Sequence, residues 1–153
     1  MALKVIILTE GGEIGGLGHI LRCISISQAF AEKGIRPKLI INGDDSIKKA
    51  LKEKNYQIFN WLKEEKGLTG LIKQADIVII DSYLGDINFY KRLSGLVKVP
   101  VYIDDNKRLD YPRGVVINSG IYAKRLKYPK RINVRYLLGN QFQKYKMVNS
   151  TGF

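Results

Sequence analysis

Short apolar runs alternate along the chain with segments whose apolar residues recur every three to four positions. The first pattern is typical of buried strands and the second of amphipathic helices. The predicted strands are Leu3–Thr9, Pro37–Asn42, Gln57–Trp61, Asp76–Asp81, Pro100–Asp104 and Val115–Asn118. The predicted helices are Ile20–Lys33, Asp45–Glu53, Leu68–Gln74 and Ile87–Val97.

Two of the predicted strands are apolar at consecutive positions, Val5–Leu8 and Ile77–Ile80. Such strands occur in parallel sheets that helices cover on both faces. Gly34 supplies a C-cap after the first helix, and Asp44–Ser46 supplies N-caps before the second. The sequence therefore predicts an α/β fold, a doubly wound Rossmann-like parallel sheet, over residues 1–140. Residues 141–153 form a short tail in this prediction.

The composition is that of a soluble globular domain, with 45% hydrophobic and 26% charged residues in a chain of 153. A single cysteine, Cys23, excludes an internal disulfide and a cysteine-rich zinc site, and makes a reducing cytoplasmic compartment the default. One histidine and scattered aspartates lack the spacing of a metal cluster, so we predict neither metal nor cofactor. The apolar run Val5–Leu8 is too short to cross a membrane, and no membrane association is expected.

Positive charge is concentrated near the end of the sequence. Residues 111–153 hold nine Lys and Arg and no acidic residue, whereas residues 1–110 hold 17 basic and 14 acidic residues. Four tyrosines are interleaved with these charges: Tyr122, Tyr128, Tyr136 and Tyr145. A basic segment of this kind can follow a nucleic-acid backbone, but it contains no nucleic-acid-binding motif. We expect instead a solvated surface, or a face turned toward an anionic sugar nucleotide or an acidic partner.

Five glycines lie within residues 11–18, between the first strand and the first helix, and lead to His19, the chain's single histidine. Glycines permit close approach of a ligand to the backbone, and a helix start offers free N–H groups. No Gly-Lys-Ser/Thr follows, so the loop is not a nucleotide-hydrolysing P-loop. Leu21 stands where a dinucleotide-binding motif requires glycine or alanine. The loop therefore indicates a general anion- or sugar-binding turn.

Polar residues follow several of the predicted strands, as Asp81-Ser82-Tyr83, Asp104-Asp105-Asn106 and Asn118-Ser119-Gly120. Ligands of open parallel sheets bind where the carboxyl ends of the strands meet. The sequence therefore predicts that one edge of the sheet gathers a histidine, several carboxylates, a phenol and an amide.

These motifs occur in the order and spacing of a known family. The segments are Glu13–Cys23, Ile80–Tyr83, Ile103–Asp105, Asn118 with Tyr122–Ala123, and Leu137–Gly139. In them the chain resembles, along nearly its whole length, the first half of PseG-type UDP-sugar hydrolases. The resemblance implies hydrolysis of a UDP-linked diacetamido sugar in pseudaminic acid or surface polysaccharide biosynthesis. It also implies the N-terminal half of a GT-B fold, as in MurG-like glycosyltransferases, with the active site between two halves.

The resemblance assigns roles to individual residues. His19 would be the general base that activates water to attack the anomeric carbon and release UDP, and Tyr83 would orient the water or the sugar. The implied substrate-binding residues are Gly16, Gly18, Arg22, Asp81, Asp104, Asp105 and Asn118. From its position at a helix start, we expect the His19 ring to stay neutral, because the positive end of the helix dipole disfavours imidazolium.

Each role has a structural alternative. His19 could cap the helix or pack against its neighbours, and Arg22 could form an ion pair with Glu13 or another acid. Cys23 is expected to be a packing residue of the helix. The Asp104–Asp105 pair could cap a turn.

The sequence also departs from the family pattern. Ser82 stands where the family has histidine, Leu8 where it has arginine, and Gly120 where many members have asparagine. The identity of the sugar is therefore open. The family's C-terminal nucleotide-binding half is not matched, so a separate or missing domain is implied and the chain alone should hydrolyse UDP-sugars poorly.

Two other functions remain open. The chain could be the acceptor-binding half of a split GT-B glycosyltransferase. It could also be a non-catalytic, basic nucleic-acid-binding domain that uses residues 111–146, with Lys124, Arg125, Lys130 and Arg131 among its contacts.

Overall fold

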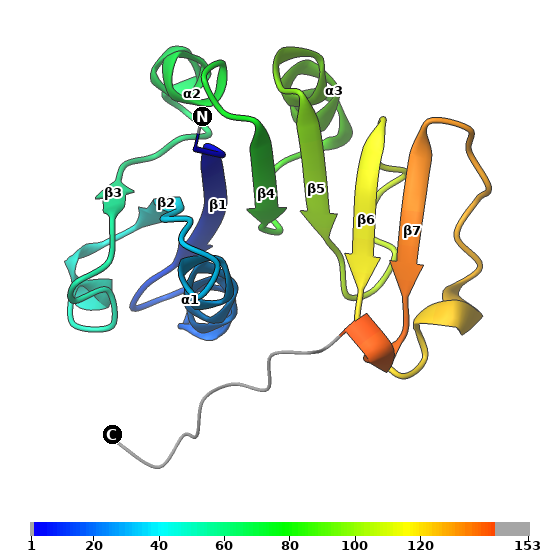
Figure 1. The fold of residues 1–153 in the computed structure, drawn as a ribbon, viewed down its shortest axis with the longest axis horizontal. Helices are drawn as coiled ribbons and strands as arrows, with labels where there is room; N and C mark the ends of the chain where they lie inside the picture. The colour runs from blue at the N-terminus through cyan, green and yellow to red at the C-terminus, as the bar shows by residue number, and fades with distance from the viewer. Residues whose placement is uncertain (1, 143–153) are drawn as a thin grey trace.

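The computed structural model describes residues 2–142 and contains a sheet of seven parallel strands (Figure 1). The strands are β1 Val5–Gly11, β2 Lys38–Gly43, β3 Tyr56–Ile58, β4 Ile77–Asp81, β5 Val99–Ile103, β6 Gly114–Asn118 and β7 Val134–Leu138. Their order across the sheet is β3-β2-β1-β4-β5-β6-β7. Three α-helices, α1 Gly18–Ala31, α2 Glu65–Ile72 and α3 Ile87–Leu96, accompany the short 3-10 helices η1 Asp45–Ile47, η2 Ala123–Leu126 and η3 Asn140–Phe142.

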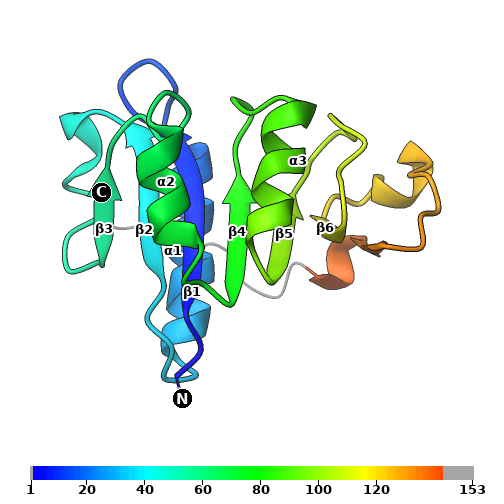
Figure 2. The same cartoon turned by 90° about the horizontal axis from the view of Figure 1, so that it is seen from above.

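Helices lie on both faces of the sheet. Figures 1 and 2 show α1 on one side of the strands and α2 and α3 on the other. The chain moves outward from β1 through β2 to β3, then returns to place β4 on the other side of β1. This arrangement confirms the predicted α/β class with a doubly wound, Rossmann-like parallel sheet. The relationship to a GT-B half stays a prediction.

Two apolar clusters explain why the central strands are apolar at consecutive positions. Successive side chains of a strand point to opposite faces. On β1, Ile6 and Leu8 join the cluster under α2 and α3, whereas Val5 and Ile7 join the cluster under α1. Both faces of β1 are therefore buried, as its sequence predicts.

Two local features differ from the predictions. Residues 45–53 form η1 followed by turns rather than an α-helix, with only Ile47 and Leu51 buried. Their lysines at positions 48, 49 and 52 would be neighbours on an α-helix, where like charges repel. β7 was not predicted as a strand. Its side-chain Arg135 interrupts the apolar run, which is tolerated because β7 lies at the edge of the sheet.

The helix-boundary glycine was predicted correctly. Gly34 has φ +77°, and its N–H donates to the carbonyl of Ala31, so it ends α1 in the conformation that favours glycine. Asp44 likewise caps η1 by accepting a hydrogen bond from the N–H of Ser46. Of the predicted tail, residues 141 and 142 belong to η3, and the rest lies outside the described residues.

Trp61 provides a test of the larger cluster. Its side chain is fully buried, its Nε1 donates to the Thr9 carbonyl at 2.9 Å, and its ring packs against Phe89. We expect Trp61→Ala to lower the free energy of unfolding by about 3–5 kcal/mol, because it leaves a cavity and an unpaired buried carbonyl. Urea denaturation measures the loss. Leu62→Ala, at a partly buried neighbour, should cost clearly less, and equal losses would contradict this packing.

Candidate functional site

The candidate site lies where the winding of the sheet reverses, between the carboxyl ends of β1 and β4. Doubly wound sheets bind ligands at this switch point, because the loops after the two strands diverge there. The loop after β1 leads through the glycines into α1, and the loop after β4 carries Ser82 and Tyr83. Thr9 pairs in register with Asp81, so the next residues, Glu10 and Ser82, also lie side by side.

Asp81 is the centre of the polar network. Its carboxylate is fully buried and accepts from His19 Nδ1 at 2.7 Å and from Nε and an Nη of Arg22 at 2.6 Å each. His19 and Arg22 are three residues apart on α1, so both side chains project from the same face of the helix. All of these partners of the buried Asp81 carboxylate therefore come from α1. A third residue of α1, Cys23, makes a weaker contact with it at 3.7 Å.

The hydrogen bond to Asp81 decides the state of the His19 ring. It raises the pKa of His19 above the usual 6.5, and the negative charges of Asp81 and Glu10 act in the same direction against burial and Arg22. The expectation of a pKa lowered by the helix dipole is therefore wrong, because the carboxylate at 2.7 Å outweighs the helix terminus. Since an ionised carboxylate only accepts, the neutral ring carries its proton on Nδ1 and leaves Nε2 free to take another.

Glu10 lies beside the free nitrogen of His19, and Tyr83 packs against its ring. Glu10 Oε1 lies 3.8 Å from Nε2, and the Tyr83 ring meets the imidazole edge to face with centroids 4.6 Å apart. Tyr83 donates its hydroxyl proton to Asp105 at 2.7 Å, which helps raise its pKa to about 12. Tyr83 is therefore a neutral hydrogen-bonding group at neutral pH.

Arg22 links the two loops through a second carboxylate. It donates to both oxygens of Asp105, at 2.7 and 3.0 Å, in addition to its bonds with Asp81. Burial opposes ionisation of Asp105, but the bonds from Arg22 and Tyr83 outweigh it and lower the pKa of Asp105. In the described residues the ion pairs of Arg22 are with Asp81 and Asp105, and Glu13 is not among its partners. Arg22 therefore pairs with acidic residues, as the structural alternative to a substrate-binding role proposed, and these residues are Asp81 and Asp105.

The glycine loop brings its backbone to the edge of the site. Gly12 and Gly16 exchange two backbone hydrogen bonds, and Gly16 has φ +73°. Gly18, the first residue of α1, is exposed, and a methyl group added there would meet no atom within 4 Å. Packing within the described residues therefore does not require a glycine at position 18. The first turn of α1 also lacks a side-chain cap.

Asp104 and Asn118 lie in a separate cluster. Both are buried, and both contact the hydroxyl of Tyr128, which donates to Asp104 and accepts from the Asn118 amide. The other side-chain oxygens accept from the backbone of Arg108 and Gly120. These bonds fix the loops after β5 and β6. The predicted role of Asp104 and Asn118 as substrate ligands stays a prediction, and Asp104 also fits the alternative of a turn cap.

Glu10, Ser82 and Arg108 belong to the site but were not among the predicted site residues. Ser82 Oγ and the N–H of Tyr83 both donate to Glu10. Arg108 donates to the carbonyls of Gly85 and Ser82 and lies 6.0 Å from the Tyr83 ring centroid, so it holds the loop that carries Tyr83. The sequence signal for Glu10 was its place at the end of a buried strand. Arg108 gave no signal, because its contacts depend on the folding of two distant loops.

Cys23 behaves as a packing residue, as expected. It is fully buried, and burial raises the pKa of its thiol well above the usual value, so it is not a ready nucleophile. Among residues 2–142 no group of three or more His, Cys, Asp or Glu side chains is arranged as a metal site. Within the same residues no helix is long and apolar enough to span a membrane.

A cavity of about 910 Å³ opens beside the polar network. Gly18, His19, Arg22 and Asp105 line it beside the network, and most of the remaining lining consists of apolar residues of α1 and of the sheet. The volume is within the range of small-molecule sites, which combine apolar walls with a few convergent polar groups.

Comparison with known proteins leaves the family open. No protein-family model matches the chain. An uncharacterized protein of Methanocaldococcus jannaschii is 24% identical over 157 residues, which cover 94% of this chain and 32% of that protein. The chain thus spans about a third of that relative's length.

The single histidine allows a direct test of the Asp81 contact. We expect NMR titration of His19 to give a pKa above 6.5, and Asp81→Asn to lower it, because the ionised acceptor is lost. Glu10→Gln, which removes a more distant charge, should lower it by less.

The exposed pair of Asp76 and Lys98 gives the control, since Asp76→Asn should leave the His19 titration unchanged. A wild-type value at or below 6.5, or equal values in wild type and Asp81→Asn, would contradict the network.

Proposed function

We propose that this chain is the part of a UDP-sugar hydrolase that carries the general base and faces the sugar, as in PseG-type enzymes. The observation that carries the proposal is the Asp81–His19 pair at the switch point, with Nε2 of His19 beside Glu10 and the Tyr83 ring packed against the imidazole. An aspartate that holds Nδ1–H orients the imidazole and stabilises the imidazolium that forms when Nε2 takes a proton.

The proposed reaction uses water as nucleophile. His19 Nε2 takes one proton of a water molecule while the water oxygen forms a bond to the anomeric carbon. The bond from that carbon to the phosphate oxygen breaks, and its electron pair leaves with UDP. Glu10 lies close enough to Nε2 to position the water or a sugar hydroxyl, and Tyr83 packs against the same imidazole. Asp81 holds the imidazolium until its proton is released.

The charge of the site supports the proposal that this chain faces the sugar rather than the diphosphate. Three carboxylates lie in the site with one arginine: Glu10 lies beside His19, and Asp81 and Asp105 are both paired with the guanidinium of Arg22. Such a cluster suits water and neutral sugar hydroxyl or acetamido groups better than a diphosphate. In this proposal the diphosphate is bound by groups outside the cluster, including any further domain of the complete protein.

A glycosyltransferase half is the second candidate, because the same His19–Asp81 pair could deprotonate an acceptor hydroxyl instead of water. Release of UDP in the absence of any acceptor separates the two functions. The hydrolase requires it, and the transferase does not.

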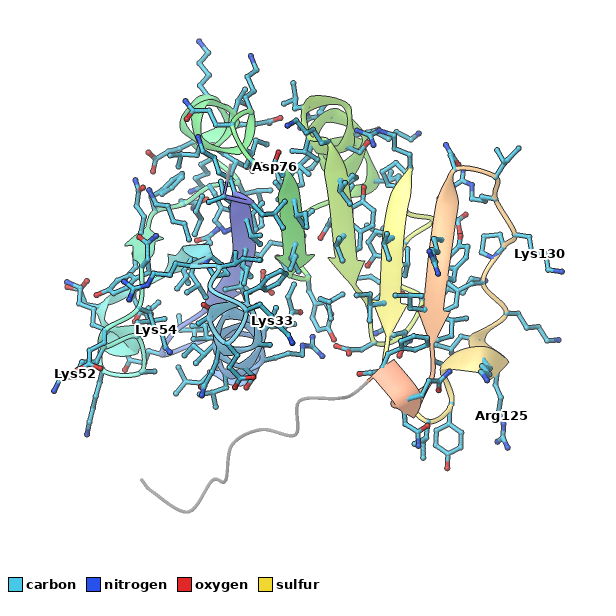
Figure 3. All side chains as sticks on the ribbon, viewed as in Figure 1. Lys33, Lys52, Lys54, Asp76, Arg125 and Lys130 are labelled. Carbon is cyan, nitrogen blue, oxygen red and sulfur yellow. The ribbon has the colours of Figure 1, made fainter. Side chains whose placement is uncertain are left out.

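The basic residues give no comparable support for nucleic-acid binding. Arg125 and Lys130 lie at the β7 side of the molecule, whereas Lys52 and Lys54 lie at the opposite, β3 side (Figure 3). Arg125 packs on the Tyr122 ring, and Arg131 donates to the carbonyls of Asp110 and Tyr111. The positive side chains are therefore spread over the surface and partly used within the fold.

Substitution of His19 tests the proposal in the complete natural polypeptide that contains this chain. We expect His19→Gln to lower kcat for UDP release from a UDP-linked diacetamido sugar by about 10²–10⁴-fold, the usual contribution of a general base. The wild-type rate should fall as the pH drops through the raised pKa of His19, because the protonated ring cannot accept. A coupled assay for UDP measures both.

Lys130→Ala, at an exposed position on the β7 side of the molecule, should keep the wild-type rate. The proposal fails if the wild-type protein releases no UDP, or if the folded His19→Gln variant retains full activity.

Gly18 tests ligand approach independently. Because an added methyl group meets no protein atom, Gly18→Ala should raise the free energy of unfolding by about 0.5–1 kcal/mol. If substrate lies against Gly18, the same methyl should raise KM about tenfold. Thermal denaturation and steady-state kinetics are the measurements. An unchanged KM in the stabilised variant would remove Gly18 from the substrate site.

A further inference from the structure

Arg108 is a cation beside the site that the proposed reaction does not use. It is partly buried in the loop after β5, and no carboxylate of the described residues lies within 4 Å of its side-chain nitrogens. Its Nε is buried and has no hydrogen-bond partner in the same part of the chain. Withdrawing a guanidinium from water costs free energy, so the contacts of its other nitrogens must hold Arg108 in this position.

These contacts reach both ends of one short turn. Nη1 of Arg108 donates to the carbonyl of Gly85 at 2.9 Å, and Nη2 donates to the carbonyl of Ser82 at 3.4 Å. Between these two residues lie Tyr83 and Leu84, whose side chains are exposed. Because the nitrogens of a guanidinium are fixed in one plane, the two hydrogen bonds set the relative position of the two ends of the turn.

The loop that supplies Arg108 also holds the far end of the Tyr83 side chain. The Tyr83 hydroxyl donates to Asp105 at 2.7 Å, and the backbone N–H of Arg108 donates to Asp104 at 3.2 Å. Tyr83 is therefore held at two places, through its hydroxyl and through the backbone on either side of it. In this arrangement its ring lies edge to face with the His19 ring, with centroids 4.6 Å apart.

Arg113 makes contacts of the same kind for a different reason. It donates to three backbone carbonyls, those of Ser94, Val97 and Lys98. They lie at the carboxyl end of α3, where the helix dipole favours a positive charge. Arg108 instead contacts Gly85, two residues before the first residue of α3, where the dipole disfavours a cation. Stabilisation of a helix end therefore does not explain Arg108.

We propose that Arg108 is a positioning residue that bridges the carbonyls of Ser82 and Gly85 and thereby holds the Tyr83 ring against His19. The turn requires the shape of the guanidinium, because the acceptors are neutral carbonyls. A lysine keeps the charge but offers one nitrogen in place of two, so it cannot make both contacts in the same geometry. The effect of Arg108 on rate rests on the proposed hydrolase function, whereas its effect on the placement of Tyr83 does not.

NMR of the full 153-residue chain tests the placement of Tyr83. His19 is the single histidine, and its ring-proton signals report the aromatic ring beside it. Tyr83→Leu removes that ring and defines the shift that it causes. We expect Arg108→Lys to move the His19 signals toward the Tyr83→Leu position, at a pH above the His19 titration. In the Tyr83→Leu background Arg108→Lys should cause no further shift, because the two residues act on His19 as a unit.

Arg113→Lys is the matched control, since the same substitution breaks arginine–carbonyl contacts at the opposite edge of the sheet. It should leave the His19 signals at their wild-type positions, even if it lowers the stability. Tyr90→Phe removes only a hydroxyl that contacts both Arg108 and the Ser82 carbonyl, so it should cause a smaller shift in the same direction.

Circular dichroism establishes which variants are folded. Wild-type His19 signals in folded Arg108→Lys, or equal shifts in Arg113→Lys, would overturn the proposal. Should Arg108→Lys not fold, wild-type His19 signals in Tyr90→Phe would overturn it.

UDP release by the complete natural polypeptide is the second readout. Arg108→Lys should lower kcat by about 10- to 100-fold, the cost of misplacing a group by about 1 Å, with a smaller change in KM. In the Tyr83→Leu background it should lower kcat no further. A wild-type kcat in folded Arg108→Lys would overturn the positioning role and leave the hydrolase standing. A wild-type protein that releases no UDP would refute the hydrolase, and the His19 signals would then decide the role of Arg108.

Discussion

The buried carboxylate of Asp81 is the constraint on which the site depends. A fully buried charge without partners is very costly, so the residues that compensate it must be held in place whenever the protein is folded. Both hydrogen-bonding partners, His19 and Arg22, come from the first two turns of α1. The start of α1 is therefore tied to the end of β4, and the glycine loop between β1 and α1 must follow the path this contact sets.

That constraint also sets the chemistry the site can support. Asp81 fixes the tautomer of His19 and raises its pKa, which makes the ring a stronger base but leaves a smaller neutral fraction at mildly acidic pH. Arg22 is committed to Asp81 and Asp105, so it acts as an internal counter-ion that joins two loops. The polar group that remains, Nε2 of His19 beside the carboxylate of Glu10, suits proton transfer rather than the binding of anions.

Sequence alone predicted the parallel α/β sheet and the meeting of His19, Asp81, Tyr83 and Asp105, because strand periodicity and the switch-point rule are local or topological. It did not predict the raised pKa of His19, since a helix dipole is visible in sequence and a 2.7 Å contact across 62 residues is not. Arg108 was missed for the same reason. The interrupted apolar pattern of β7 concealed an edge strand, whose solvent-facing positions need not be apolar.

The two surfaces of α1 connect the site to the cavity beside it. One side of the helix is anchored in the core by Ile20 and Cys23, while the ridge that begins with His19 and Arg22 continues through Ile26 and Phe30 along the cavity. Anything that packs on this ridge also presses on the element that supplies both partners of Asp81.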